Sequence, residues 1–309
     1  MQPSAVANTT NLTASPSQFY SWQNYRCAYE VHQPINTTSE GIPLLLIHPI
    51  GVGLSRRFWQ RFCHEWYSTG QRNLIYNPDL LGCGESEMPR IAYTPSDWAE
   101  QLQSFLQKVV QKPVILVVQG ALLPVAIQLV QKESNLIAGL VLSGPPAWAL
   151  MTNKPPKWQE KFLWNVLDSP FGSAFYRYAR TPKFLRSFSI RQLFASENAV
   201  DAEWLNTLLA GAENPASRHA VFSFLAGFWR DDYTSFIASI GQPTLAVMGE
   251  TTSSISQDNK KETPDERLAH YLACLPKSRG IKINGRNVLP YESTAEFVAA
   301  IAPFINEVS

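Results

Sequence analysis

The stretch VILVVQGALLPVA, residues 114–126, decides how the rest of the chain is interpreted. Its β-branched start predicts a buried strand, its small residues predict a tight turn, and its apolar end predicts a helix. In a sharp strand–turn–helix of this kind the residue at the turn presents its side chain above the sheet. Here that residue is Gly120. Because glycine has no side chain, the position carries no nucleophilic atom.

Further short apolar segments alternate with helical ones on both sides of this stretch. Strands are predicted at 43–47, 73–79, 136–142, 243–250 and 280–283, after a hairpin at 19–31, and helices at about 58–67, 97–110, 264–274 and 293–306. Thr94 or Ser96 is the expected N-cap of the 97–110 helix. Strands that alternate with helices at this spacing predict βαβ units, and therefore an α/β fold with a mostly parallel sheet and helices on both faces.

The pattern changes between residues 145 and 238, where the segment is mostly helical and rich in aromatic residues. A chain of 309 residues accommodates one large α/β domain with an insertion. We therefore expect a disordered polar tail at 1–17, a core made of 18–144 and 239–309, and a helical cap inserted at 145–238.

Composition excludes several classes of protein. The formal net charge is +1, with 17% charged and 45% hydrophobic residues, so nothing indicates a nucleic-acid partner. The four cysteines are scattered and form no CxxC pair, which predicts reduced, buried thiols, no metal site and no cofactor. The first residues lack the pattern of a secretory signal, and no run of about 18 apolar residues occurs, so we expect a cytoplasmic protein.

Five motifs occur in a recognisable order. They are the loop His48–Gly53, the turn DLLGCGES at 79–86, the strand–turn–helix centred on 117–122, Gly249-Glu250, and the segment Gly285–Glu292. In these motifs the chain resembles the cap-bearing, single-chain group of the α/β-hydrolase superfamily, which includes esterases, epoxide hydrolases, dehalogenases and C–C bond hydrolases. The resemblance covers 43–150 and 240–306, and it implies an α/β-hydrolase fold with 145–238 in the place of the cap.

The resemblance also implies where a catalytic triad would lie. Gly120 stands in the place of the nucleophile, Thr252 in the place of the acid and Asn287 in the place of the histidine. Glycine has no nucleophilic atom, threonine carries no charge to stabilise an imidazolium, and asparagine does not exchange a proton near neutral pH. Three such exchanges in one chain predict a pseudoenzyme.

Other residues are expected around the same site. The candidate pocket and oxyanion-loop residues are His48, Pro49, Gly51, Gln119, Ala121 and Ser143, and the candidate structural neighbours are Asp79, Gly82 and Gly84. His48 is expected to pack and hydrogen-bond rather than to catalyse, and Asp79 to brace its loop. Gln119 offers its amide either to a ligand or to the backbone, and we favour the backbone.

The cap is the second candidate functional region. Between Trp148 and Phe194 the sequence contains eight basic residues but two acidic ones, Glu160 and Asp168. Ten large aromatic residues are interleaved with them. The basic residues are Lys154, Lys157, Lys161, Arg177, Arg180, Lys183, Arg186 and Arg191. Basic and aromatic residues on short amphipathic helices suit an anionic membrane surface. The alternative is that the aromatic residues form the cap's own core and the basic residues its solvated face.

Three functions follow from these observations. The first is a catalytically impaired α/β-hydrolase-like protein that binds an apolar ligand, such as a lipid, prenyl or pigment-like molecule, or a protein or peripheral membrane partner. The chain is also loosely similar to hydrolase-like proteins of cyanobacteria and plastids, some of which act on chlorophyll tails. This similarity is the basis on which the candidate ligands are ranked. The second is an active hydrolase or lyase with displaced catalytic residues. The third is a structural or assembly factor without a ligand.

Overall fold

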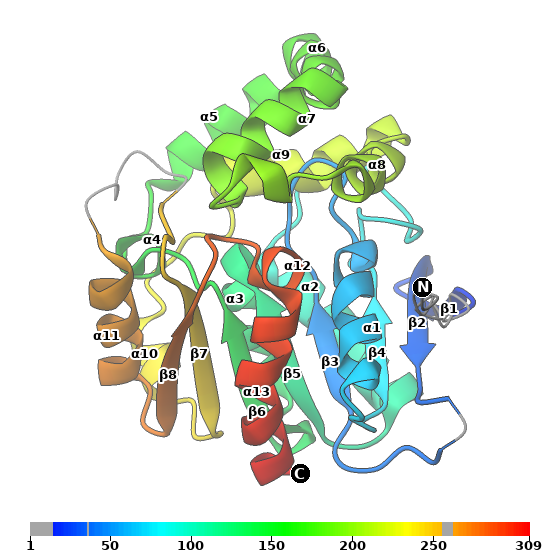
Figure 1. Ribbon diagram of the computed structural model, residues 1–309. Helices are drawn as coiled ribbons and strands as arrows, with labels where there is room; N and C mark the ends of the chain where they lie inside the picture. The colour runs from blue at the N-terminus through cyan, green and yellow to red at the C-terminus, as the bar shows by residue number, and fades with distance from the viewer. Residues whose placement is uncertain (1–14, 36, 255–261) are drawn as a thin grey trace, which may run out of the picture.

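The computed structural model describes residues 15–35, 37–254 and 262–309, so most of the predicted tail, 1–14, lies outside the described residues. Eight strands of the described chain form one sheet in the order β1-β2-β4-β3-β5-β6-β7-β8 (Figure 1). The strands are β1 Gln18–Trp22, β2 Tyr25–His32, β3 Leu44–Ile47, β4 Ile75–Pro78, β5 Val114–Gln119, β6 Ile137–Ser143, β7 Thr244–Gly249 and β8 Ser278–Ile283. β2 pairs antiparallel with β1 and β4, and every other pair is parallel. The predicted mostly parallel sheet is confirmed.

Helices cover both faces of this sheet, which explains why β3 and β5 are buried along their whole length and why both are apolar up to the polar Gln119 that ends β5. On one face lie α1 (Gln60–Ser68), the short α12 (Leu289–Glu292) and α13 (Thr294–Val308). On the other lie α2 (Pro95–Phe105) and α3 (Leu123–Lys132), with α11 (Pro264–Cys274) near the β8 edge (Figure 1). Two hydrophobic cores result, one on each side of the sheet.

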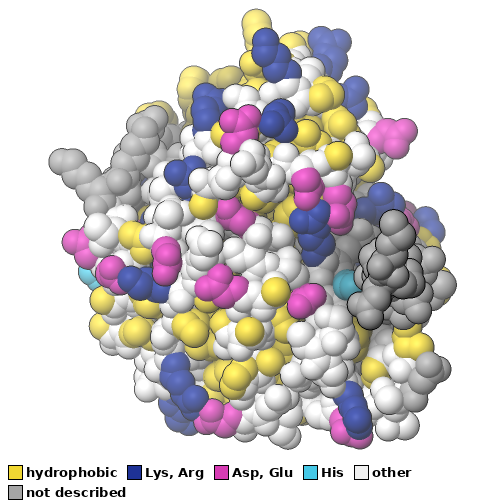
Figure 2. All heavy atoms as spheres, in the orientation of Figure 1, with side chains coloured by type: hydrophobic (Ala, Val, Ile, Leu, Met, Phe, Trp, Pro, Cys, Tyr) yellow, Lys and Arg dark blue, Asp and Glu magenta, His cyan; other side chains and the backbone are white. Residues whose placement is uncertain are grey.

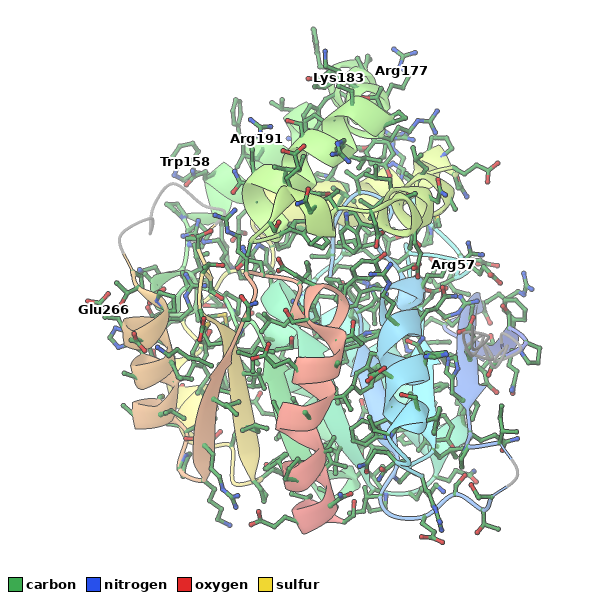
Figure 3. The ribbon with its side chains drawn as sticks, in the orientation of Figure 1. Arg57, Trp158, Arg177, Lys183, Arg191 and Glu266 are labelled. Atoms are coloured by element: carbon green, nitrogen blue, oxygen red, sulfur yellow. The ribbon has the colours of Figure 1, made fainter. Side chains whose placement is uncertain are left out.

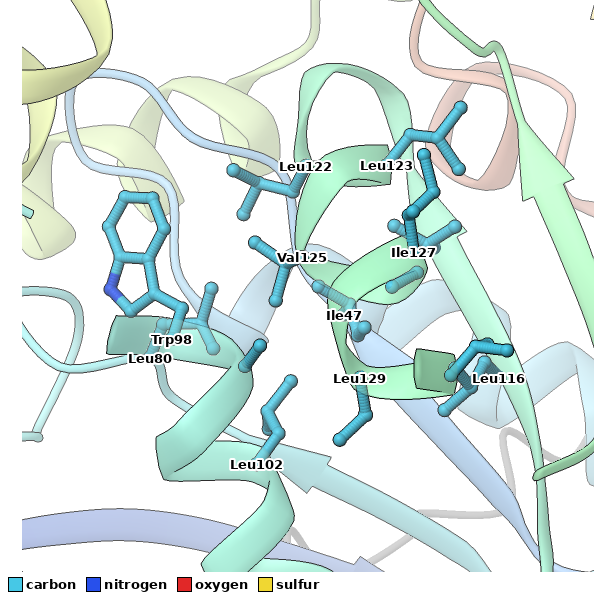
Figure 4. Packing of buried hydrophobic residues seen from close by; sticks show 14 of the residues in the cluster. Ile47, Leu80, Trp98, Leu102, Leu116, Leu122, Leu123, Val125, Ile127 and Leu129 are labelled. Carbon is cyan, nitrogen blue, oxygen red and sulfur yellow. The ribbon is translucent and has the colours of Figure 1, made fainter. Parts of the chain in front are cut away.

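The core behind the central strands is formed where α2 meets α3. Figure 4 shows Trp98 and Leu102 of α2 facing Val125 and Leu129 of α3, and all four side chains are buried. Burial of each such side chain contributes about 1.5–3 kcal/mol. This packing fixes α3, and therefore the turn that leads into it, against the sheet.

The start of α2 has the N-cap that the sequence predicted, whereas its end differs from the predicted helix end. Thr94 is the N-cap and forms a reciprocal capping box with Asp97. The α-helix ends at Phe105, and the predicted remainder of the helix, Leu106–Val110, is a π-helix.

Between β6 and β7 the described chain contains only helices. The helices α5 (Lys157–Leu167), α6 (Pro170–Ala179), α7 (Pro182–Phe188), α8 (Ala202–Gly211) and α9 (Arg218–Ala226) lie above the carboxyl ends of the strands (Figure 1). The flanking helices α4 (Trp148–Thr152) and α10 (Thr234–Ala238) belong instead to the core cluster beneath them. The predicted insertion, 145–238, therefore includes at both ends segments that pack on the core.

The cysteines are free. Cys27, Cys63 and Cys83 are buried, but Cys274 near the end of α11 is partly exposed, contrary to the prediction that all four are buried. Burial raises the pKa of Cys274 above its usual value, so its thiol is not activated.

Candidate functional site

The turn after β5 has the backbone shape that a catalytic nucleophile would need. Gly120 has a φ of +60°, in the left-handed region, and opens the short 3-10 turn Gly120–Leu122 that leads into α3. A Cβ built at Gly120 would meet no atom nearer than the Gly144 carbonyl oxygen at 4.0 Å. The position therefore has room for a side chain, and its cost would come from the left-handed backbone, about 1–2 kcal/mol.

Gln119, just before this turn, is held by two hydrogen bonds. Ser143 Oγ donates to Gln119 Oε1 at 2.7 Å, and Gln119 Nε2 donates to the Asn287 carbonyl oxygen at 2.7 Å. The side chains of Gln119 and Ser143 are buried. Both ends of the amide thus bind neighbours in the protein, which joins the ends of β5 and β6 to the loop after β8.

Thr252, which follows β7, has a similar structural contact. Its hydroxyl donates to the Arg286 carbonyl oxygen at 2.6 Å, and its side chain is buried. The side chain links the loops after β7 and β8 and carries no charge that could polarise an imidazole.

Asn287, which follows β8, connects the core to the cap. Its Nδ2 donates to the Gln192 carbonyl oxygen at 2.7 Å and to the Ser253 carbonyl oxygen at 3.1 Å. Its backbone N–H donates to the Leu193 carbonyl oxygen at 3.0 Å. Gln192 and Leu193 belong to a π-helical turn, Ser189–Leu193, where the chain leaves α7. One amide hydrogen and the backbone N–H of Asn287 therefore hold the cap, while the other amide hydrogen binds the loop after β7.

Glu292, which the sequence analysis left without a role, strengthens this attachment. Its carboxylate accepts the backbone N–H of Ala195 at 2.6 Å and that of Arg286 at 2.9 Å. Arg286 in turn donates to the Arg191 carbonyl oxygen at 2.9 Å. The loop after β8 thus holds residues 191–195 of the cap through several hydrogen bonds.

His48 is fully buried and uses both of its ring nitrogens. Nδ1 lies 2.8 Å from the Pro49 carbonyl oxygen, and Nε2 accepts the backbone N–H of Leu80 at 3.1 Å. Burial lowers the pKa of His48, so the imidazole is neutral with its proton on Nδ1. With neither nitrogen available to a substrate, His48 fixes the loop that carries it to the 79–86 turn.

Asp79 braces that turn. Its carboxylate accepts the backbone N–H groups of Arg56 and Glu85, each at 2.8 Å, and pairs with the Arg56 guanidinium. A Cβ at Gly84 would overlap the Asp79 carboxylate, which explains the glycine at that position. Asp79 is completely buried, so these contacts compensate its charge inside the protein.

The sequence analysis did not find the cluster around Arg56. This arginine is 1% exposed, and besides Asp79 it contacts Glu30 at 2.9 Å and Glu85 at 3.0 Å. Burial opposes its charge, but Asp79 and Glu30 outweigh burial and raise the pKa of Arg56 above its usual value. The cluster joins β2, the 79–86 turn and the loop before α1 through charges that must remain paired.

The remaining predicted residues lie around the turn. Pro49, Gly82 and Ser143 are buried, and Gly51, Ala121 and Gly144 are partly exposed, as are Gly120 and Asn287. The partly exposed residues mark the surface on which a ligand would approach the turn.

The other four histidines do not reach this site. His64 is exposed on α1, His219 faces Asp168 in the cap at 3.6 Å, and His270 stacks on Trp148. His32 lies on β2, which is three strands from β5 in the sheet.

His32 is nevertheless notable because a hydroxyl, a thiol and a carboxylate surround it. Ser15 Oγ lies 3.3 Å from Nδ1, Glu30 lies 3.2 Å from Nε2, and Cys63 is close by. Burial alone would lower the pKa of His32, but Cys63 and Glu30 raise it to about 10. A protonated imidazole cannot act as a general base near neutral pH. The cluster lies three strands from β5 and is therefore separate from the elbow.

Among the cavities of the described residues, one of about 490 Å³ lies on the cap near the start of α6. It is lined by Arg90, Asp168, Ser169, Pro170, Ser173, Tyr176, Arg177, Pro215 and Arg218. None of these residues belongs to the set predicted around Gly120, so this cavity is distinct from the elbow.

A mostly parallel sheet with helices on both faces, a sharp turn after β5 and helices inserted between β6 and β7 define the class of α/β-hydrolase-fold proteins. The sequence model of the alpha/beta hydrolase family matches residues 44–301, and the chain belongs to this family. No curated protein matches it.

Solved structures agree on the fold. A serine hydrolase involved in carbazole degradation (CarC) is 19% identical, with a TM-score of 0.71 over 95% of this chain and 100% of that one. An esterase from Thermogutta terrifontis is 19% identical, with a TM-score of 0.71 over 95% and 99%. A bromoperoxidase from Bacillus anthracis is 16% identical, with a TM-score of 0.70 over 94% and 100%. At these identities the similarity concerns the fold alone.

Proposed function

We propose that this chain is a catalytically impaired member of the α/β hydrolase family that binds an apolar ligand or a partner instead of turning over a substrate. The observation that carries the proposal is the chemistry of three positions after β5, β7 and β8. Gly120 has no side chain, and the side chains of Thr252 and Asn287 donate their hydrogens to backbone carbonyls. Without a nucleophile and a base at the elbow, the family's covalent chemistry has no starting point.

A reactive probe tests the missing nucleophile. The unmodified chain is expected to remain unlabelled by a fluorophosphonate, which reacts with activated serine hydroxyls, as judged by intact mass. A Gly120→Ser/Thr252→Asp/Asn287→His variant supplies the absent groups on the same backbone, and Gly120→Ala is the matched control because it has the same backbone cost without a hydroxyl. Stoichiometric labelling of the unmodified chain at a residue beside the elbow would contradict the proposal.

The apolar-ligand part of the proposal rests on the partly exposed surface around the turn. Gly51, Val52, Ala121 and Gly144 are small or apolar and are not completely buried. A prenyl alcohol or a fatty acid that binds there raises the free energy of unfolding by about 2.7 kcal/mol at a hundredfold excess over its Kd. Thermal unfolding with and without such ligands measures this, with Ala121→Lys as the variant that should abolish the shift.

A second candidate is an active hydrolase or lyase with displaced residues, and the cluster of Cys63, His32 and Glu30 is the observation that favours it. Against it stand the burial of Cys63 and the raised pKa of His32. Turnover of an ester that disappears in Cys63→Ala but persists in Gly120→Ala would support this alternative.

A further inference from the structure

Exposed hydrophobic side chains are concentrated on two neighbouring cap helices. Twelve large hydrophobic residues are exposed in the described chain, and six of them lie on α5 and α6. They are Trp158, Phe162 and Val166 on α5 and Phe171, Phe175 and Tyr178 on α6, with exposed fractions between 41% and 82%. We call this set the outer aromatic face. Scattered exposed hydrophobics are ordinary, but a concentration on two helices indicates an interaction surface.

The spacing of these residues explains why they share a side of each helix. The three on α5 lie at positions i, i+4 and i+8, and the three on α6 lie at i, i+4 and i+7. The cap's own core is formed by other residues: Trp164 and Leu167 of α5 and Tyr176 of α6 pack with Val221 and Phe222 of α9. Apart from Tyr178, whose ring packs against Phe184 of α7, the outer aromatic face is therefore additional to the residues that hold the cap together.

Basic side chains without acidic partners accompany this face. In the part of the chain that the structure describes, no ion pair involves Lys157, Lys161, Arg177 or Lys183. Figure 3 shows Arg177, Lys183 and Trp158 pointing away from the body of the cap. Figure 2 shows yellow and dark blue side chains next to one another at the top of the molecule, above the sheet.

Acidic side chains offset only part of this charge, through the electrostatic interaction of Glu160 with Lys157. Glu160 is partly buried, and Asp168 is paired with Arg90 at 3.1 Å. By contrast, Lys154 and Arg186 of the predicted basic set have acidic partners, Asp231 and Glu197. The surface next to the outer aromatic face is thus positive and free to meet a negative partner.

We propose that the outer aromatic face, with Lys157, Lys161, Arg177 and Lys183, docks this protein on the surface of an anionic lipid bilayer. The inference rests on the partner-binding part of the proposed function and is independent of its catalytic part. Aromatic rings lie at the level of the headgroups, where an apolar body and a polar surrounding are both satisfied, and the cations meet lipid phosphates.

Two features favour a bilayer over a second copy of the chain. Two outer aromatic faces brought together would place eight cations that lack ion-pair partners in one interface. Each close like-charge contact would weaken association by more than about tenfold. The helices also lie at the extremity of the molecule (Figure 1), where they can reach a flat surface without interference from the core. None of the helices in the described chain is long and apolar enough to cross a membrane. The contact would therefore be peripheral.

Co-sedimentation of the full chain with phosphatidylcholine vesicles, with and without phosphatidylserine, tests the proposal. We expect binding to the anionic vesicles at low salt, a loss of binding at high salt, and a blue shift of tryptophan emission that Trp158→Phe removes. Each cation removed, as in Lys157→Gln/Lys161→Gln, is expected to lower the partition coefficient about fivefold.

Matched controls separate the face from general surface charge. Lys112→Gln/Lys277→Gln removes two exposed cations from loops that precede β5 and β8, at the opposite ends of the strands from the cap, and should bind as the unmodified chain does. Phe162→Ser/Phe171→Ser should bind anionic vesicles more weakly. Because both side chains are exposed, this variant should keep the stability of the unmodified chain, so weaker binding would not reflect unfolding.

Several results would overturn the proposal. These are equal sedimentation with neutral and anionic vesicles, no sedimentation at low salt, or unaltered binding of the Lys157→Gln/Lys161→Gln variant. A dimer in analytical ultracentrifugation that Phe162→Ser/Phe171→Ser makes monomeric would also overturn it, and would assign the face to a second copy. Because none of these measurements uses an ester substrate, the docking proposal and the loss of catalysis can fail separately.

Discussion

The loops above the sheet and the outer side of the cap use their polar and aromatic residues in opposite ways. Above the sheet, Gln119, Thr252 and Asn287 bind neighbouring side chains or backbone carbonyls, and His48 has both nitrogens occupied. On the cap, four cations form no ion pair within the described chain, and the side chains of the outer aromatic face are exposed, although Tyr178 packs against the ring of Phe184. The comparison shows that the residues free to contact other molecules lie on the cap rather than at the triad positions.

The largest expected effect is at the buried Arg56 cluster. Arg56→Ala leaves Asp79 and Glu30 buried without their cation, and should lower the free energy of unfolding by about 3–5 kcal/mol. Urea unfolding measures the change. Arg57→Ala is the matched control, because this neighbouring side chain is exposed and its only ion pair among the described residues, to Glu85, is 3.7 Å long. This change should cost less than about 0.5 kcal/mol. Equal losses would show that the cluster does not brace the loops.

Asn287→Ala tests whether this residue attaches the cap. The change removes the hydrogen bonds to Gln192 and Ser253 and leaves their carbonyls without these donors, so we expect a loss of about 1–3 kcal/mol. Hydrogen exchange should become faster in residues 189–195. Asn284→Ala, an exposed asparagine in the same loop, is the control and should leave that exchange unchanged. Unaltered exchange in Asn287→Ala would mean that other contacts hold the cap.

Gly120→Ala measures the cost of the elbow's backbone. Because the nearest atom to an added Cβ is 4.0 Å away, the loss should reflect the left-handed φ alone, about 1–2 kcal/mol. Thermal unfolding gives the value. A loss well above this range would indicate a steric clash and would remove the argument that the site has room for a nucleophile.

The pH dependence of stability tests the neutral state of His48. Burial lowers its pKa in the folded protein, so below the unfolded pKa of about 6.5 the unfolded chain binds a proton that the folded chain does not. Stability should therefore fall as pH decreases below that value, with at most about 1.4 kcal/mol per pH unit from this group. The pKa of His219 is also lowered by burial, so the measurement compares the unmodified chain with His48→Gln. An unchanged slope in the variant would contradict the assignment.

The smallest effect is expected on the cap. Lys157→Gln/Lys161→Gln and Phe162→Ser/Phe171→Ser should change the free energy of unfolding by less than about 0.5 kcal/mol, because these side chains are exposed and lack internal partners. Circular dichroism during urea unfolding measures this. A loss of 2 kcal/mol or more, of the size typical of core positions, would show that the outer aromatic face stabilises the cap itself.

The sequence predicted the fold because its signals are local and repeated. The apolar strands at 44–47 and 114–119, the Thr94 N-cap and the turn at Gly120 each appear as short patterns in a fixed order. The resemblance to the α/β-hydrolase superfamily singled out positions 120, 252 and 287, and each of them follows a strand of the sheet.

The contacts of these residues could not be predicted, because they join distant parts of the chain. The hydrogen bond from Asn287 to Gln192 spans 95 residues, and nothing in the sequence marks Gln192 as its partner. Arg56 and Arg57 are adjacent residues of the same type, yet Arg56 is buried and Arg57 is exposed. The 3-10 turn Arg56–Trp59 determines which of the two points inward, and the sequence does not reveal this. For the cap, the sequence could not show which side of α5 and α6 is buried, because both helices carry apolar residues on two sides. The packing against α9 determines the buried side.

The most direct test of the central claim is steady-state hydrolysis of p-nitrophenyl esters, from acetate to decanoate, by the unmodified chain. The proposed loss of nucleophile and base predicts rates equal to those of Gly120→Ala and of buffer containing an equal concentration of an inert protein. Saturable turnover by the unmodified chain, well above both controls and retained through repeated purification, would contradict the claim that the elbow no longer reacts.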